Sequence, residues 1–232
     1  MIRVLVVDDQ ALVRAGVGLL LRTAGDFEVV GEAGDGLDAV RLSERLHPDV
    51  VLMDLRMPRL DGIEATRRIL ARQPGVRVLV LTTFADDADV YGALGAGAIG
   101  YLVKDGAPED LLDAVRRAVR GESLVAPRVL ARIVQRAISA HDREARAGTG
   151  DPQPALRLLS TREREVLALV GAGLSNAEIG ALLHLGVTTV KTHVSAVMEK
   201  LELRNRVQAA VVAHRLGLVD DDFNPVADLP AP

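Results

Sequence analysis

Short hydrophobic runs alternate with amphipathic stretches over the first half of the chain. The runs are rich in Val, Leu and Ile, which is typical of strands buried in a parallel sheet. The pattern predicts strands at 2–7, 27–33, 50–53, 76–81 and 100–103, and helices at 10–24, 36–46, 61–72, 86–96 and 108–120. Five βα repeats predict an α/β fold, a doubly wound five-stranded parallel sheet with helices on both faces.

The pattern becomes purely helical in the last third of the chain. Four short helices with glycines at the breaks predict a small all-α domain, and its middle pair suits a helix-turn-helix. Several helix starts carry residues with the spacing of capping signals. The predicted helices are 161–171, 176–183, 189–201 and 206–216, and the start signals are Ser160 with Glu163, Ser175 with Glu178, Asn205 with Gln208, and Thr188 or its neighbour.

The length of 232 residues favours two domains. Between them the sequence turns polar and rich in Ala, Gly, Pro and Asp, as in flexible linkers. Acids and prolines at the end of the chain are typical of a disordered tail. The predicted division is a front domain at 1–122, a linker at 123–155 with a short helix at 127–140, a helical domain at 156–217 and a disordered tail at 218–232.

Composition and charge narrow the class of protein. The chain has no cysteine, which excludes disulfides and thiolate metal sites and fits a reducing cytosol. No apolar run approaches the length of about 18 residues that indicates a membrane-spanning helix. We therefore expect a cytoplasmic protein without a membrane partner. Residues 1–126 hold 15 Lys and Arg against 20 Asp and Glu, whereas 157–215 hold 8 against 5, which indicates nucleic-acid binding by the rear domain.

Polar residues stand where the predicted strands of the front domain stop. They are Asp8, Asp9, Asp54, Thr82 and Lys104. In an open α/β sheet, ligands bind beyond the carboxyl ends of the strands, so these side chains are expected to share one pocket. Three carboxylates there would repel one another unless a divalent cation neutralised them, and hard oxygen ligands suit Mg²⁺.

Each of these residues has a predicted role. Asp54 follows a central strand and faces the acids after the first strand, so it is the predicted phosphoryl acceptor. Asp8 and Asp9 would hold the metal. Lys104 would pair with the acceptor or its phosphate as a point charge. Taken singly, these aspartates could equally be turn formers or helix caps, and Lys104 an ordinary solvated cation.

A hydroxyl and an aromatic ring next to this pocket suggest a switch. Thr82 could bond a phosphoryl oxygen, and the space left by its movement could be filled by Tyr101. Such a linked shift lets a small change in charge bias a two-state element. The alternative for Tyr101 is an ordinary half-buried position in the sheet.

The motifs of the front half resemble the receiver domain of bacterial response regulators over about residues 1–120. They are VVDD at 6–9, MDLRMP at 53–58, DG at 61–62, LTTF at 81–84 and GYLVKD at 100–105. The resemblance implies the strand order 2-1-3-4-5 and phosphoryl transfer from a phosphohistidine of a sensor histidine kinase to Asp54. It also implies Mg²⁺ bound by Asp9, Asp54 and the backbone carbonyl of Arg56, with Asp8 nearby. Arg59 departs from the Gly of many relatives, with little effect expected.

The predicted third helix of the rear domain has two distinct faces. At about 100° per residue, Val190, Val194, Val197 and Leu201 form an apolar stripe that should be buried. The opposite face carries short hydroxyls, Glu199 and one Lys, which would allow close approach to DNA in the major groove. An ordinary solvated polar face is the alternative. The candidate DNA-contacting residues on this face are Thr188, Lys191, Thr192 and Ser195.

The rear block resembles the LuxR-type helix-turn-helix over about residues 156–216. Its motifs are LSTREREVL at 159–167, GLSNAEI at 173–179 and TVKTHV at 189–194. The resemblance implies that 189–201 is the recognition helix, with Lys191, Thr192 and Ser195 reading base edges. Ser195 departs from the Lys of some relatives, which lowers the charge delivered to the groove. The last helix resembles the dimer contact of the family, although it could be plain core.

Together the two halves are similar to the NarL/FixJ-type response regulators. We therefore expect a transcription regulator, not an enzyme, in which phosphorylation of Asp54 switches dimerisation and sequence-specific DNA binding. The expected partners are DNA, a sensor histidine kinase and a second copy of the phosphorylated chain, with RNA polymerase as a further candidate. One rival is an aspartate-nucleophile phosphatase or phosphotransferase, although the nucleophile of such enzymes usually follows the first strand. Another is a receiver that is never phosphorylated and acts as a docking module.

Overall fold

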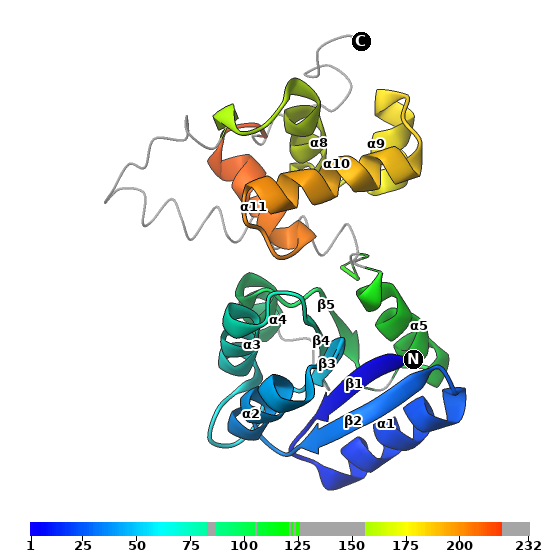
Figure 1. Ribbon diagram of the computed structural model, residues 1–232. Coiled ribbons are helices and arrows are strands. Elements are labelled where there is room, and N and C mark those ends of the chain that lie inside the picture. Colours follow the sequence, from blue (N-terminus) through cyan, green and yellow to red (C-terminus); the bar gives the residue numbers. More distant parts are fainter. Residues whose placement is uncertain (83–86, 105, 121, 123, 126–155, 220–232) are drawn as a thin grey trace. The chain divides into compact units, whose positions relative to one another are not determined.

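The computed structural model of the chain describes all residues except 83–86, 105, 121, 123, 126–155 and 220–232 (Figure 1). The chain divides into two compact units after Val125, and each unit is described separately. The predicted helix at 127–140 and nearly all of the predicted linker and tail lie outside the described residues, so the domain boundaries stay predictions. No helix in the described part of the chain is long and apolar enough to cross a membrane.

The front unit contains a five-stranded parallel sheet in the order β2-β1-β3-β4-β5. This confirms the predicted fold class, and the element bounds agree with the predicted ones to within one residue. The strands are β1 (Ile2–Val7), β2 (Phe27–Ala33), β3 (Val50–Met53), β4 (Arg77–Thr82) and β5 (Gly100–Val103). The helices are α1 (Ala11–Ala24), α2 (Gly36–Leu46), α3 (Gly62–Arg72), α4 (Asp87–Ala96) and α5 (Pro108–Val119).

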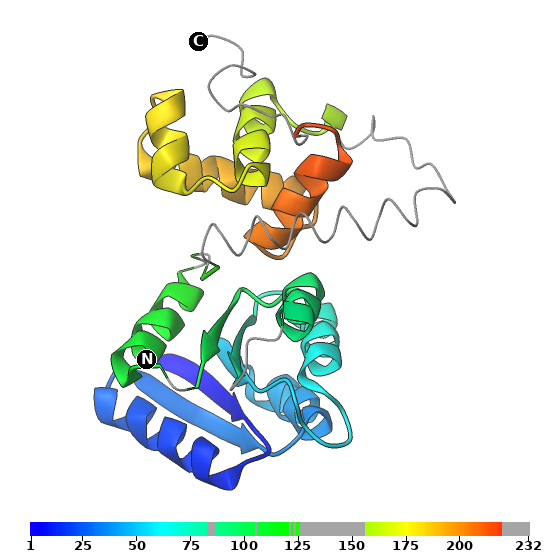
Figure 2. The same cartoon turned by 180° about the vertical axis from the view of Figure 1, so that it is seen from behind.

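Helices cover both faces of the sheet (Figures 1 and 2). Because side chains along a strand alternate between the two faces, each strand feeds two separate cores. Val4 and Val6 belong to the core under α1 and α5. Leu5 and Val7 belong to the core under α2 and α3. Burial on both faces explains why the central strands read as continuous apolar runs.

The loop before α3 holds an unusual arginine. Arg59 has φ 67°, a left-handed conformation that favours glycine. Its guanidinium forms an ion pair with Asp35, a buried residue that caps α2 by accepting a hydrogen bond from the backbone N–H of Asp38. The departure from Gly at this position is therefore accompanied by a contact that a glycine could not make.

The residues after α5 return to the edge of the sheet. Leu124 forms a short parallel bridge with Gly100 of the edge strand β5. A Cβ atom on Gly100 would lie 2.4 Å from the Cβ of Leu124, so the glycine leaves room for this close approach. Glu122 forms ion pairs with Arg117 and Arg120 at 3.3 and 3.1 Å, and these hold the start of the returning segment. The front unit therefore continues beyond its last helix.

The described part of the second unit contains four helices. They are α8 (Thr161–Gly171), α9 (Asn176–Leu183), α10 (Val187–Lys200) and α11 (Arg206–Arg215). The predicted capping boxes at the starts of α8 and α9 are confirmed, and Asn205 caps α11. The predicted cap at Thr188 or its neighbour is wrong, because α10 starts at Val187, two residues before the predicted start at 189, with Gly186 as its N-cap. Thr188 consequently lies within the first turn.

The capping box of α8 also carries an ion pair. Glu163 accepts a hydrogen bond from the backbone N–H of Ser160 at 2.7 Å, and Lys200 at the end of α10 donates to both of its carboxylate oxygens. The bond from Lys200, together with the backbone bond from Ser160, lowers the pKa of Glu163 to about 2. One buried carboxylate thus ties the start of α8 to the end of α10.

We expect Glu163→Ala to destabilise the second unit by about 1–3 kcal/mol, since it removes the cap and leaves Lys200 without its partner. Glu178→Ala is the matched control, because Glu178 makes the same 2.7 Å capping bond to Ser175 from an exposed position. Glu178→Ala should destabilise the second unit by less than Glu163→Ala does. Urea unfolding of the full chain, followed by amide exchange in α8, measures both.

The same carboxylate gives the second unit an acid-sensitive contact. The pKa of Glu163 is depressed, so its stabilising effect is complete above the ordinary value of 4.5 and is lost as the pH falls toward about 2. The wild type should therefore lose more stability across this window than Glu163→Ala. Equal pH dependence of the two proteins would contradict the ion pair.

Candidate functional site

Three carboxylates converge beyond the carboxyl ends of β1 and β3. One oxygen from each of Asp8, Asp9 and Asp54 lies within 4.8 Å of the others. Asp8 and Asp54 are buried, whereas Asp9 is exposed. The parallel pairing of β1 and β3 explains the convergence, since both strands end at the same edge with Val7 opposite Met53. Residues 45 positions apart, Asp9 and Asp54, thus share one site.

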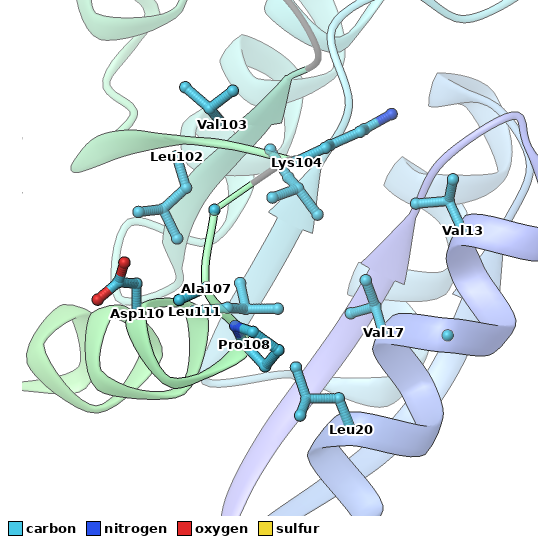
Figure 3. Close-up of a pocket in the computed structure, with 13 residues that line it drawn as sticks. Val13, Val17, Leu20, Leu102, Val103, Lys104, Ala107, Pro108, Asp110 and Leu111 are labelled. Carbon is cyan, nitrogen blue, oxygen red and sulfur yellow. The ribbon is translucent and has the colours of Figure 1, made fainter.

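Lys104 brings a cation to the same carboxylates. Its Nζ lies 2.5 Å from Oδ2 of Asp8 and 3.1 Å from Oδ1 of Asp54. The backbone N–H of Lys104 donates to the carbonyl of Thr82 at 2.8 Å, which continues the pairing of β4 and β5 past the end of β5. Figure 3 shows the side chain of Lys104 extended away from Leu102 and Val103. The sheet therefore sets the place of the ammonium group.

The site has more negative than positive charge. Burial raises the pKa of Asp54 above its ordinary value, and Asp8 acts in the same direction, although Lys104 opposes both. Burial lowers the pKa of Lys104, but its contacts with Asp8 and Asp54 outweigh this effect and raise the pKa overall. Three ionised carboxylates and one ammonium leave an excess of two negative charges. A divalent cation would balance them, and the donors are the hard oxygens that Mg²⁺ prefers.

The backbone around Asp54 is tightly fixed. Its N–H donates to the carbonyl of Val7 at 2.9 Å, and the N–H of Gly62 donates to the carbonyl of Leu55 at 2.9 Å. A Cβ atom on Gly62 would lie 2.0 Å from the carbonyl oxygen of Asp54. Only a glycine therefore allows the start of α3 to pass so close behind the acidic residue.

The two predicted switch residues lie on neighbouring strands. Thr82 is the buried last residue of β4, and Tyr101 is a partly exposed residue of β5 opposite Val80. Leu81 and Leu102 pack in the core under α1 and α5. Since side chains alternate along a strand, Thr82 and Tyr101 both project from the other face of the sheet.

Arg56, whose backbone carbonyl is a predicted Mg²⁺ ligand, lies two residues after Asp54. Its side chain is exposed and forms an ion pair with Asp89 of α4 at 3.0 Å. Phe84, the last residue of the LTTF motif, lies outside the described residues.

An apolar cavity of about 380 Å³ lies between α1 and the start of α5 (Figure 3). Val13, Val17 and Leu20 line it from α1, and Pro108 and Leu111 line it from α5. The sequence pattern does not predict this cavity. The spacing of the three α1 residues indicates only that they share one face of the helix.

In the second unit, α10 has the two faces predicted for it. Val190, Val194 and Val197 are buried. Leu201, the fourth residue of the predicted apolar stripe, is the C-cap of α10 and is only partly buried. The four candidate DNA-contacting residues are all exposed, and the hydroxyl of Thr192 donates to the carbonyl of Thr188 at 3.1 Å. They are Thr188, Lys191, Thr192 and Ser195. A helix with a small, polar and largely exposed face fits the width of the major groove.

The doubly wound sheet with its acidic edge, followed by a helix-turn-helix unit, defines a two-domain DNA-binding regulator. Comparison with known families agrees with this class. Residues 4–116 match the response regulator receiver domain, and residues 157–213 match the bacterial regulatory proteins of the luxR family. The chain belongs to the two-component response regulators that join a receiver domain to a LuxR-type DNA-binding domain, and it is a transcription regulator, not an enzyme.

Curated relatives match over nearly the whole chain. The transcriptional regulatory protein LiaR of Bacillus subtilis is 42% identical over 95% of this chain and 100% of its own length. The response regulator VraR of Staphylococcus aureus is 41% identical over 94% of this chain and 99% of its own length.

Solved structures match the same architecture. The receiver domain of a response regulator NarL from Mycobacterium tuberculosis is 39% identical, with a TM-score of 0.51, over 52% of this chain and 98% of that one. The response regulator RcsB of Salmonella typhimurium is 25% identical, with a TM-score of 0.52, over 94% of this chain and 100% of that one.

Proposed function

We propose that Asp54 is the phosphoryl acceptor and that its phosphorylation controls DNA binding by α10. A carboxylate oxygen of Asp54 would attack the phosphorus of a phosphohistidine on a sensor histidine kinase, and the bond between phosphorus and the imidazole nitrogen would break. The observation that carries this proposal is the convergence of Asp8, Asp9, Asp54 and Lys104 at one edge of the sheet. The family supports it, since these regulators receive their signal by phosphorylation.

The acidic residues fit Mg²⁺ as the cofactor. Asp9, Asp54 and the backbone carbonyl of Arg56 would hold the ion, with Asp8 beside it. When bound, Mg²⁺ would neutralise charge that develops on the transferring phosphoryl group. Lys104 already contacts Asp54, and it would move its ammonium group to a phosphoryl oxygen once one is present.

The switch would follow from the position of Thr82 and Tyr101 on one face of the sheet. A phosphoryl oxygen on Asp54 would accept a hydrogen bond from the hydroxyl of Thr82, which draws that side chain toward the acidic edge. The ring of Tyr101 on the neighbouring strand would then fill the space left behind. This changes the outer surface of β5, which is how a local charge biases a two-state element.

In the response, two phosphorylated chains would form a homodimer. The dimer would place two copies of α10 in successive major grooves of a palindromic site in the cytoplasm. Thr188, Lys191, Thr192 and Ser195 form the proposed reading face, and RNA polymerase is a further candidate partner. Because phosphate contacts release counterions, binding should weaken steeply with salt.

A comparison of DNA binding with and without phosphorylation tests the proposal. The full chain, treated with acetyl phosphate and Mg²⁺ or left untreated, is used to select genomic fragments, and affinity is then measured on an enriched fragment. Phosphorylation should raise affinity by at least about fivefold, which is the lower range of allosteric coupling, and sedimentation should show a dimer. Asp54→Asn is the control and should not respond. Equal affinity of fully labelled and unlabelled protein would overturn the switch.

Lys191→Ala should weaken specific binding by about 1–3 kcal/mol if Lys191 contacts a base. Arg215→Ala is the matched control, because it removes one positive charge from an exposed position at the end of α11. Footprinting titrations on the same fragment measure both variants. Unchanged affinity of Lys191→Ala would remove this residue from the reading face.

A further inference from the structure

The peptide group between Asp8 and Asp9 lies where the hydrogen bonding of the sheet stops. The N–H of Asp8 still donates to the carbonyl of Ala33 at 3.1 Å, as the last bond between β1 and β2. On the other side, Val7 accepts from the N–H of Asp54. The carbonyl of Asp8 comes after both of these contacts, so the sheet supplies no donor for it, and a buried carbonyl needs one.

Arg14 of α1 supplies that donor. Its Nη1 donates to the carbonyl oxygen of Asp8 at 2.6 Å. On the other side, its Nε lies 3.9 Å from Oε2 of Glu32 in β2. Long side chains on a helix point back toward its N-terminus, which is the direction that this contact requires. The side chain of Arg14 is only 21% exposed, so the guanidinium is held in place.

The two acidic side chains of this loop are fixed to different degrees. Oδ1 of Asp8 accepts a hydrogen bond from the backbone N–H of Gln10 at 2.9 Å, and its Oδ2 faces Lys104. No hydrogen bond or ion pair of the Asp9 carboxylate occurs among the residues that the structure describes. The direction of Asp9 therefore depends on the backbone, and above all on the plane of the peptide group that precedes it.

We infer that Arg14 is a positioning residue for the cation site. By holding the carbonyl of Asp8, it fixes the plane of the peptide group between Asp8 and Asp9, and it thereby directs the Asp9 carboxylate toward Asp8 and Asp54. The inference rests on the proposed Mg²⁺ site and adds to it a residue outside the ligand set. Groups that orient metal ligands typically contribute about 10–100-fold to metal affinity.

The charge of Arg14 has the opposite effect on cation binding. A guanidinium close to the three carboxylates repels Mg²⁺, so if Arg14 acted through charge alone, its removal would tighten binding. If it positions Asp9, its removal weakens binding. The two roles therefore predict changes of opposite sign.

Calorimetric titration of the full chain with Mg²⁺ distinguishes these roles. Arg14→Met keeps much of the length of the side chain and removes the donor. Arg22→Met is the matched control, because Arg22 lies on the same helix and contacts the same Glu32, at 3.7 Å, and no hydrogen bond from it to the acidic loop occurs among the described residues. We expect the Mg²⁺ dissociation constant to rise about tenfold in Arg14→Met and to stay within about twofold of the wild type in Arg22→Met.

Each outcome has one meaning. Unchanged or tighter Mg²⁺ binding by Arg14→Met overturns the inference, as does an equal loss in Arg22→Met. Absence of Mg²⁺ binding by the wild type would instead refute the proposed cation site. Thermal unfolding in EDTA checks that each variant is folded, and Arg14→Leu, which also lacks a donor, takes the place of Arg14→Met if the latter is not. Labelling by acetyl phosphate should be slow in the variant at low Mg²⁺ and recover at saturating Mg²⁺, which a general loss of structure would not produce.

Discussion

Asp54→Asn is expected to reduce labelling by acetyl phosphate and Mg²⁺ to background, and at the same time to stabilise the metal-free protein. Labelling is lost because an amide cannot take the place of the attacking carboxylate. Stability rises because Asn keeps the shape of Asp54 but removes one of three negative charges gathered at the edge of the sheet. A residue whose loss both abolishes modification and strengthens the fold is typical of a functional site.

The pH dependence of this stabilisation follows from the pKa of Asp54. Burial, with Asp8 acting in the same direction, raises that pKa above its value in the unfolded chain. The folded protein therefore binds the proton more tightly, and stability is lost as the pH rises from the ordinary value of 3.8 through the folded pKa. Asp54→Asn should lack this loss, so its advantage over the wild type should be larger at neutral pH than in acid.

Phosphate-affinity gels measure the labelling, and thermal unfolding in EDTA measures the stability. Asp61→Asn is the matched control. Asp61 is exposed and caps α3 by accepting a hydrogen bond from the N–H of Glu64, a role that Asn can also fill. Labelling of Asp61→Asn should be preserved. Persistent labelling of Asp54→Asn would refute Asp54 as the acceptor.

Gly62→Ala should destabilise the front unit by about 3 kcal/mol or more. The added Cβ would lie 2.0 Å from the carbonyl oxygen of Asp54 and 2.9 Å from the Cα of Leu55. Both are backbone atoms of the loop that carries the acceptor, so relief requires the loop or α3 to move. The gain in helix propensity of about 1 kcal/mol is too small to offset this cost. Labelling of Asp54 should also become slower.

Gly16→Ala is the control, and its expected effect on stability is opposite to that of Gly62→Ala. Gly16 lies within α1, and nothing lies within 4 Å of a Cβ built there. The same substitution should therefore stabilise the protein by about 0.5–1 kcal/mol. Urea unfolding of both variants is the measurement. A loss of less than about 1 kcal/mol in Gly62→Ala would show that the loop yields easily and that the close approach is not a constraint.

The sheet and its acidic edge could be predicted from the sequence because they depend on local patterns. Hydrophobic runs define the strands, and parallel strands necessarily end at a common edge, so Asp54 and Lys104 could be placed together from their positions alone. Helix starts could also be predicted where a side chain provides the cap, as Ser160 and Ser175 do.

Other contacts depend on tertiary packing, which the sequence pattern does not encode. The start of α10 is one of them. A Cβ on Gly180 would lie 2.7 Å from the carbonyl oxygen of Leu185, so a glycine in α9 lets the turn pack closely and the next helix begins at once. No sequence signal near Thr188 indicates that α10 begins at Val187. His184 and Arg59 adopt left-handed conformations that sequence statistics would assign to glycine.

The contacts of Lys200 and Arg14 could not be predicted from the sequence either. Lys200 and Glu163 are 37 residues apart. Glu163 lies at the start of α8 and Lys200 at the end of α10, and each suits its own helix end, so neither residue indicates the contact. Arg14 lies six residues after Asp8, on a helix whose pattern indicates only an amphipathic surface. Since a long side chain can reach many partners, its target is decided by the fold.

The bridge between Gly100 and Leu124 determines where the front unit can be cut. β5 is an edge strand, and unpaired edge groups are templates for pairing with other chains. A protein ending at residue 122 would lose Leu124, expose Gly100 and leave this edge open to self-association. An isolated receiver should therefore be expressed with an end at or beyond Val125, and the shorter fragment should aggregate more readily on concentration.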